Sequence, residues 1–398
     1  MKCAARSVLG RRTASINDEP AGYPSGMTTS AATIKRTPLY DWHVARGARM
    51  VEYAGWEMPV IYTGIPAEHN QCRTSGALFD VSHMGRLRFV GADAKRFLAH
   101  VCTRDASKLT PGQSRYGFVC QEDGGILDDV IIACPPEADH MRMVCNASNR
   151  AKLLEHFEKV KQAMHADVTI EDHTEATAMI ALQGPKVMHY VHEKLTEAAG
   201  MDVGTLKKFG WVEGTWDGKP IGIYRSGYTG EDGVELVVPA EFATEVADWA
   251  CEDGTIAPAV LGARDTLRVE AALPLYGHEL DDTVTPFHVG MSWAVNAGRT
   301  FVGATALENV RDIGPDKVLV GLELDGRRTA RQGQAVVVDD LEVGQVTSGV
   351  YGPTVGKSVA MAFVTADYSG VMTPLGVDFK RETVQAKVVP LPFYKRAQ

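Results

Sequence analysis

The stretch RYGFVCQEDGGILDDVII, residues 115–132, places two strand-like runs on either side of an acidic, glycine-rich turn. This pattern predicts a β-hairpin. If Gln121 pairs with Ile126 across a four-residue loop, Phe118 lies opposite Asp129. Because strand side chains alternate between faces, one face of the hairpin then carries Tyr116, Phe118, Leu127, Asp129 and Ile131.

Two consecutive aspartates in this hairpin are unusual for a core strand. Asp128 and Asp129 should point to opposite faces, so both cannot enter one pocket. A register slip of one residue would exchange them. A carboxylate on this apolar face should have a pKa above the usual value of about 3.9, which suits a general base or a group that orients a nucleophile. The alternative is a structural aspartate that binds loop amides or an arginine.

A second unit, GYTGEDGVELVV at residues 227–238, places three glycines before a strand that contains Glu235. The spacing differs from GxGxxG and no capped helix follows, which disfavours a phosphate-binding loop. A glutamate within a strand suits recognition of adjacent N–H groups on a heterocycle, although a structural role on an edge strand is the alternative. In the predicted helix that follows, Arg264 and Arg268 stand one turn apart, which is typical of a solvated face.

The wider chain predicts an α+β fold. Strands and helices mix without a repeat, as in the strand at residues 86–90, which runs into a helix that Asp93 should cap. After roughly Asn296 short β-rich segments predict a separate all-β barrel or sandwich, with a boundary between Asn296 and Lys317. We therefore expect a disordered extension at residues 1–30, a catalytic region at 31–296 and a barrel domain at 297–398.

Composition excludes several classes of protein. The 398 residues carry a formal net charge of −9 and no long basic run, so nucleic acid is not an expected partner. No apolar stretch is long enough to span a membrane. The seven cysteines are scattered without CxxC spacing, and the histidines lack ligand spacing, so we expect reduced thiols and no metal. The basic start predicts a cytoplasmic extension or, alternatively, a signal for the mitochondrial matrix.

Several short segments occur together and in order. They are TPLYDWH, AGWEMPVIY, FDVSHMG, GGILDDV, LQGP, GYTGEDGVE, ARDTLRVEAALPLYG, VTSG and LPFYKR, spanning Thr37 to Arg396. As an ordered set they resemble the aminomethyltransferase, or T protein, of the glycine cleavage system. The resemblance implies a folate-binding part of two interleaved ferredoxin-like subdomains, followed by a C-terminal distorted β-barrel.

The resemblance also implies roles for individual residues. The second aspartate of GGILDD, Asp129, would be catalytic, Glu235 would bind the pterin edge, and Arg264 would contact the folate. Further residues that would line the site are Met84, Tyr116, Asn146, Tyr228, Trp293 and Tyr394. The chain departs from the family pattern at Gly117 and Gly352, which puts the positioning of Tyr116 and one barrel loop in question.

The implied reaction transfers an aminomethyl group from the lipoyl arm of the H protein to tetrahydrofolate, which serves as co-substrate. Its products would be ammonia, 5,10-methylenetetrahydrofolate and the dihydrolipoyl H protein, with no metal required. One alternative is a non-catalytic folate-binding protein of the same fold, but the KGCYxGQE-like motif of that class is missing. Others are the folate domain of sarcosine or dimethylglycine oxidases, which usually follows a flavin domain, and an interaction module.

Overall fold

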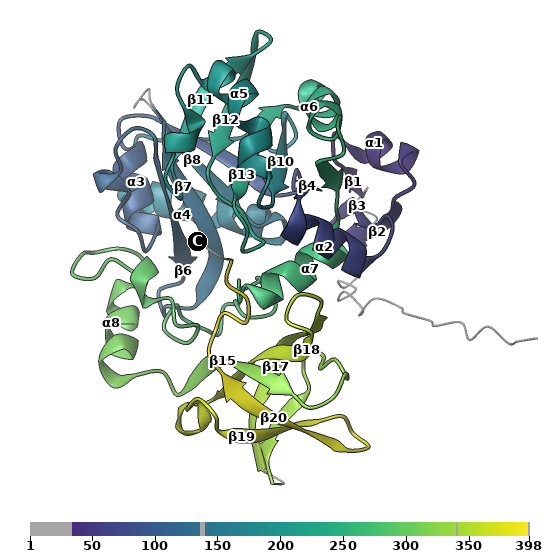
Figure 1. Ribbon diagram of the computed structural model, residues 1–398. Coiled ribbons are helices and arrows are strands. Elements are labelled where there is room, and N and C mark those ends of the chain that lie inside the picture. Colours follow the sequence, from purple (N-terminus) through teal and green to yellow (C-terminus); the bar gives the residue numbers. More distant parts are fainter. Residues whose placement is uncertain (1–33, 136–139, 340, 397–398) are drawn as a thin grey trace, which may run out of the picture. The chain divides into compact units, whose positions relative to one another are not determined.

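The computed structural model describes residues 34–135, 140–339 and 341–396 (Figure 1). The extension predicted for residues 1–30 lies outside them. Within these ranges, no helix has both the length and the apolar character needed to cross a membrane.

The first large sheet has six strands in the order β11-β12-β13-β10-β4-β14. In that order they are β11 (Trp211–Trp216), β12 (Lys219–Tyr224), β13 (Gly233–Pro239), β10 (Thr177–Gln183), β4 (Gly76–Asp80) and β14 (Ile256–Pro258). The second sheet has five strands in the order β6-β7-β8-β5-β9. They are β6 (Gln113–Cys120), β7 (Ile126–Cys134), β8 (His140–Cys145), β5 (Gly85–Val90) and β9 (Thr169–Asp172). The sheets are interleaved, because the chain builds all of the second between β4 and β10.

Helices bury the apolar faces of these sheets. The second sheet packs on α3 (Ala94–Val101) and α4 (Arg150–Met164), where Phe89, Phe97 and Phe157 meet in one aromatic core. The first sheet packs on α5 (Val187–Ala199) and α6 (Ala243–Ala250). The N-terminal elements are α1 (Tyr40–Ala45), α2 (Ile65–Thr74) and a three-stranded sheet of β1 (Lys35–Arg36), β3 (Trp56–Ile61) and β2 (Arg49–Tyr53).

The C-terminal part of the described chain is a closed barrel, which follows α8 (Ala304–Ile313). Its strands are β15 (Lys317–Leu324), β18 (Lys357–Thr365), β17 (Leu341–Gly352), β16 (Ala335–Val338), β19 (Pro374–Asp378) and β20 (Thr383–Val389). Five of them match the β-rich segments seen in the sequence. The strand β19 was not predicted, because Pro374 and Gly376 interrupt its apolar pattern.

The hairpin of β6 and β7 has the predicted register at its centre, where Phe118 pairs with Asp129. Near the turn the prediction is wrong, because Ile126 pairs with Cys120 rather than Gln121. A β-bulge at this end inserts one residue into β7 and reverses the faces of the side chains before it.

The bulge moves Leu127 to the face opposite the predicted one. Leu127 packs in the cluster that contains Val119 and Val130, while Ile126 joins Phe118. A second local prediction also fails. Asp93 stands before α3 but its side chain does not cap that helix; it binds Arg96 and the backbone N–H of Asp167 instead.

Candidate functional site

Asp129 lies half-buried at the centre of the β6–β7 hairpin. The Tyr116 hydroxyl donates to its Oδ2 at 3.1 Å, and the Asn146 amide donates to its Oδ1 at 2.7 Å. Tyr116 comes from the paired strand β6, whereas Asn146 follows the last residue of β8 on the other side of β7. The carboxylate is therefore held from both neighbouring strands.

The neighbouring Asp128 is bound by the same amide. Asn146 Nδ2 lies 2.8 Å from Asp128 Oδ1, and the Asn146 backbone N–H donates to Asp128 Oδ2 at 2.9 Å. Asn149 Nδ2 adds a further hydrogen bond at 2.6 Å. The two carboxylates still alternate along β7, as expected, but one amide binds both of them. The amide lies at the end of the adjacent strand, where its two hydrogens reach one carboxylate each.

Both carboxyls of this pair are harder to ionise than a free aspartate. Burial, followed by the negative charge of Asp129, raises the pKa of Asp128 to about 8. Burial also raises the pKa of Asp129 to about 6, while the hydrogen bonds from Tyr116 and Asn146 partly oppose the rise. The pair therefore keeps a proton to a higher pH than free aspartates would.

Glu235 lies on β13, where it pairs with Ala181 of β10 and Tyr224 of β12. It occupies a central strand, and the Ser226 hydroxyl donates to its carboxylate. Burial raises the pKa of Glu235, although the Ser226 hydrogen bond and the charge of Arg264 act against the rise. The edge-strand alternative for this glutamate is thus wrong.

Arg264 comes from α7 (Leu261–Glu270) and lies 4.7 Å over the ring of Tyr228. The Tyr228 hydroxyl donates to the carbonyl of Pro274, which fixes the ring. Among the described residues no carboxylate forms an ion pair with Arg264, although its charge lowers the pKa of both Asp129 and Glu235. The site thus contains a cation and two carboxylates that are not used up in pairing with one another.

Glycine is required at one position of the loop that carries Tyr228. A Cβ at Gly227 would lie 1.7 Å from Oε1 of Gln183. Gln183 needs that space, because its amide donates to the Ser226 carbonyl at 3.0 Å and its Oε1 accepts from Thr229 at 3.1 Å. The packed glutamine therefore sets the path of the loop.

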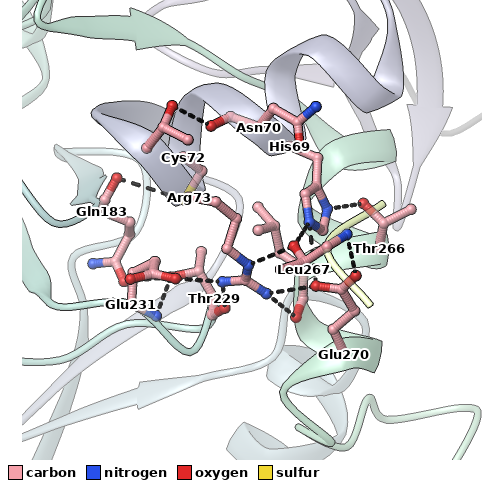
Figure 2. Close-up of polar contacts among 12 residues, drawn as sticks. His69, Asn70, Cys72, Arg73, Gln183, Thr229, Glu231, Thr266, Leu267 and Glu270 are labelled. Atoms are coloured by element: carbon pink, nitrogen blue, oxygen red, sulfur yellow. Dashed lines mark hydrogen bonds and ion pairs between the residues drawn. The ribbon is translucent and has the colours of Figure 1, made fainter. Parts of the chain in front are cut away.

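A buried arginine clamps the other side of this loop. Figure 2 shows Arg73 of α2 pointing between the loop and α7, with hydrogen bonds to the Thr229 carbonyl at 2.6 Å, to Glu231 at 2.9 Å and to Glu270 at 3.1 Å. The ring of Tyr394 lies 3.9 Å from the Arg73 guanidinium. The structure thus places Tyr394 beside Arg73, whereas Asp129 lies on the β6–β7 hairpin.

The two remaining predicted residues flank the hairpin. Met84 packs with the apolar cluster that includes Ile131. Trp293 is 55% exposed, and its ring lies 5.8 Å from the ring of Tyr116. Its carbonyl accepts from Arg104 at 2.6 Å.

Sequence reasoning missed a buried arginine on α7. Arg268 is 1% exposed, donates to Glu279 at 2.9 Å, and reaches Ser348 in the barrel at 2.9 Å. The expected solvated face is therefore wrong for this residue. Helical spacing alone offered no signal for it, because both acceptors lie outside the helix.

Comparison with known proteins places this arrangement in a family. The model of the GCVT N-terminal domain matches residues 39–299, and that of the glycine cleavage T-protein C-terminal barrel domain matches residues 317–395. The chain belongs to the glycine cleavage T-protein family. The predicted membership, enzyme class and fold of interleaved subdomains with a barrel are therefore confirmed.

Individual members of the T-protein family match along most of the chain. An aminomethyltransferase of Rubrobacter xylanophilus is 45% identical, over 93% of this chain and 97% of its own length. One from Exiguobacterium sibiricum is 41% identical, over 93% of this chain and all of its own. The solved aminomethyltransferase T of Bartonella henselae has a TM-score of 0.84 at 32% identity, covering 91% of this chain and 98% of that structure. These matches do not favour the non-catalytic alternative.

Proposed function

We propose that this T-protein family member transfers the methylene carbon of an aminomethyl group from the lipoyl arm of the H protein to tetrahydrofolate. The products are ammonia, 5,10-methylenetetrahydrofolate and the dihydrolipoyl H protein. The observation that carries the assignment of the site is the half-buried Asp129, bound by Tyr116 and Asn146 and reached by the charge of Arg264. The regions 31–296 and 297–398 are proposed as its catalytic and barrel domains.

Folate recognition is assigned to the glycine-rich loop and α7. Glu235 can accept hydrogen bonds from two adjacent N–H groups of the pterin edge, because its strand holds the carboxylate fixed. Arg264 has no ion-pair partner among the described residues and can bind an acceptor of the folate. Tyr228 supports this arginine with its ring. Met84, Trp293 and Tyr394 are proposed as further contacts.

Asp129 supplies a negative charge near the reacting atoms. As N5 attacks the methylene, positive charge develops on nitrogen, and a nearby carboxylate stabilises it. The two hydrogens of N5 and N10 end on the departing ammonia and on the lipoyl sulfur. With a pKa of about 6, Asp129 can accept one of these protons and release it again near neutral pH. Asn146 and Tyr116 keep its oxygens in place.

No step assigned here uses a metal. The described part of the chain has no group of three or more His, Cys, Asp or Glu side chains placed to hold a metal ion, and the absence of a metal stays a prediction. The H protein and the folate are proposed from the family, as is a cytoplasmic location. Nucleic acid remains an unexpected partner on the basis of charge.

The test is ammonia release from aminomethyl-loaded H protein in the presence of tetrahydrofolate. Asp129→Asn keeps the shape of the side chain but removes its charge, and should lower kcat about 100-fold or more. The exposed Asp217→Asn is the matched control and should leave the rate unchanged. Asp129→Asn activity within a few fold of wild type would remove Asp129 from the reaction. Folate binding without any ammonia release would favour the non-catalytic alternative.

A further inference from the structure

Asp128 is a fully buried carboxylate to which the proposed reaction assigns no role. Its exposed fraction is 0%, whereas the neighbouring Asp129 is half-buried. Among the described residues no cation forms an ion pair with Asp128, and the nearby Lys152 donates to the hydroxyl of Tyr276 instead. A buried acid without a counter-charge is costly, and acids of this kind gather at functional sites.

Three N–H groups hold Asp128, and all of them are neutral donors. Its Oδ1 accepts from the side-chain amides of Asn146 and Asn149 at 2.8 Å and 2.6 Å, and its Oδ2 accepts from the backbone N–H of Asn146 at 2.9 Å. An asparagine at position 128 cannot replace this carboxylate, because either orientation of its amide turns an N–H toward a donor. The surroundings therefore require an acceptor at both oxygens.

Both asparagines stand where a side chain usually caps a helix. Asn146 precedes the 3-10 helix at Ala147–Asn149, and Asn149 precedes α4. Asparagine is common at such positions because its side-chain oxygen accepts from the first N–H groups of the helix. Neither side chain makes this hydrogen bond. Both amides turn their nitrogens to Asp128 instead, so two caps give way to the binding of one carboxylate.

The Asn146 amide passes this restraint on to Asp129. Its nitrogen carries two hydrogens, and it lies 2.8 Å from Asp128 Oδ1 and 2.7 Å from Asp129 Oδ1. If the amide turned over, its oxygen would face two carboxylate oxygens. Asp128 therefore determines which end of the Asn146 amide reaches Asp129.

We propose that Asp128 is a positioning residue for the transfer reaction, because it fixes the Asn146 amide that holds the Asp129 carboxylate. This inference rests on the proposed function. Asp128 touches no substrate, and its effect reaches the reacting atoms through Asn146. A displacement of about 1 Å at a reacting group can cost on the order of 100-fold in rate. Loss of Asp128 should therefore lower kcat and leave the folate contacts of Glu235 and Arg264 intact.

The experiment measures kcat for ammonia release and the KM for tetrahydrofolate in the full-length protein, with aminomethyl-loaded H protein as donor. Asp128→Asn should lower kcat about 10-fold or more and leave the KM within about twofold. Asn146→Ala should lower kcat at least as much, and the double variant should be no slower than Asn146→Ala alone. Asp93→Asn is the matched control, because Asp93 also accepts from a backbone N–H, and it should keep the kcat of wild type.

A kcat of Asp128→Asn within about twofold of wild type would overturn the inference. A double variant slower than Asn146→Ala by the full factor of Asp128→Asn would also overturn it, because Asp128 would then act without Asn146. A raised KM at unchanged kcat would do the same, because Asp128 would then support folate binding.

Thermal unfolding verifies that each variant is folded at the assay temperature. If Asp128→Asn is not, Asp128→Ser takes its place with the same expected results, because a hydroxyl can accept from an N–H without opposing it. Failure of the proposed function has a different signature: wild type itself then releases no ammonia from the loaded H protein, and the inference falls with it.

Discussion

Two groups of buried carboxylates lie in this protein, and they are held in opposite ways. Glu231 and Glu270 face the Arg73 guanidinium, and Glu270 also binds His69 at 3.2 Å. Asp128 and Asp129 accept hydrogen bonds from neutral groups of the described residues, chiefly the Asn146 amide, and the Arg264 cation acts on Asp129 without an ion pair. A structural clamp neutralises its acids, whereas the proposed reaction site leaves its acids poised to exchange a proton.

The pKa of Glu270 shifts in the opposite direction to the pKa values of Asp128 and Asp129. Burial alone would raise the pKa of Glu270, but hydrogen bonds from His69 and Thr354 lower it to about 2. Its contribution to stability is present above the unfolded pKa and is lost as pH falls through about 2. The raised pKa values of Asp128 and Asp129 act oppositely, because their contribution is complete below the unfolded pKa and is lost as pH rises through about 6 and about 8.

Breaking the clamp should have the largest effect. Arg73→Met leaves two buried carboxylates without their cation, and we expect a loss of about 3–5 kcal/mol in the free energy of unfolding, measured by urea denaturation. Arg328→Met removes an exposed ion pair with Glu382 and should cost less than about 1 kcal/mol. Equal losses in the two variants would show that the clamp does not hold the loop.

Replacing the glutamate of the glycine-rich loop should weaken folate binding. Glu235→Gln removes the charge that we assign to the pterin edge, and a charge-assisted hydrogen bond is worth about 1.5–3 kcal/mol. The Kd for tetrahydrofolate should therefore rise about 10- to 100-fold in a binding titration. The exposed Glu245→Gln should bind as wild type does. An unchanged Kd for Glu235→Gln would remove Glu235 from the folate site.

The carboxylate pair can be tested by pH. Wild type should become less stable between pH 5 and pH 9 as Asp129 and Asp128 ionise, whereas Asp128→Asn has one group fewer to ionise. The stability difference between the two proteins should change by about 1.4 kcal/mol or more across this range, in favour of the variant at high pH. Thermal unfolding at each pH measures it. Parallel curves would mean that Asp128 is already charged at pH 5.

The smallest effect is expected at the edge of the clamp. Burial and then a hydrogen bond with Glu231 raise the pKa of Tyr394 to about 12. Tyr394→Phe removes this hydrogen bond but keeps the ring over Arg73, so the unfolding free energy should fall by about 1 kcal/mol. Tyr351→Phe, in the barrel, offers a control with a single hydroxyl bond to a loop carbonyl. A loss of folate affinity in Tyr394→Phe beyond the stability change would support a direct folate contact.

Local pattern was enough to predict the centre of the hairpin and most barrel strands. The assumed four-residue turn placed Phe118 opposite Asp129, as the structure has it, and alternation then assigned side chains to the two faces. The alternating pattern could not show the bulge that moves Leu127 to the other face, because a bulge is a change in strand pairing and not in residue types. Strand β19 was not predicted because Pro374 and Gly376 interrupt its apolar pattern.

The contacts that define the site are long-range, and the sequence does not encode their geometry locally. Asn146 reaches Asp128 and Asp129 only because β8 pairs beside β7, and no spacing rule brings Arg73 to Glu231. The ordered resemblance named Asp129, Glu235 and Arg264, but not the amide that joins the two aspartates or the arginine that clamps the loop. The family resemblance therefore predicted the roles of individual residues, whereas the residues that hold them in place became visible only in the structure.

The order in which the barrel strands pair has a consequence for synthesis of the chain. The last strand, β20, pairs with both β15 and β19, so it closes the cylinder. Until Thr383–Val389 leaves the ribosome, both partners retain an unpaired edge. A stop codon or a protease cut before this segment would preserve two open edges, the kind of surface that recruits strands from other molecules. The C-terminal strand thus protects the chain against aggregation.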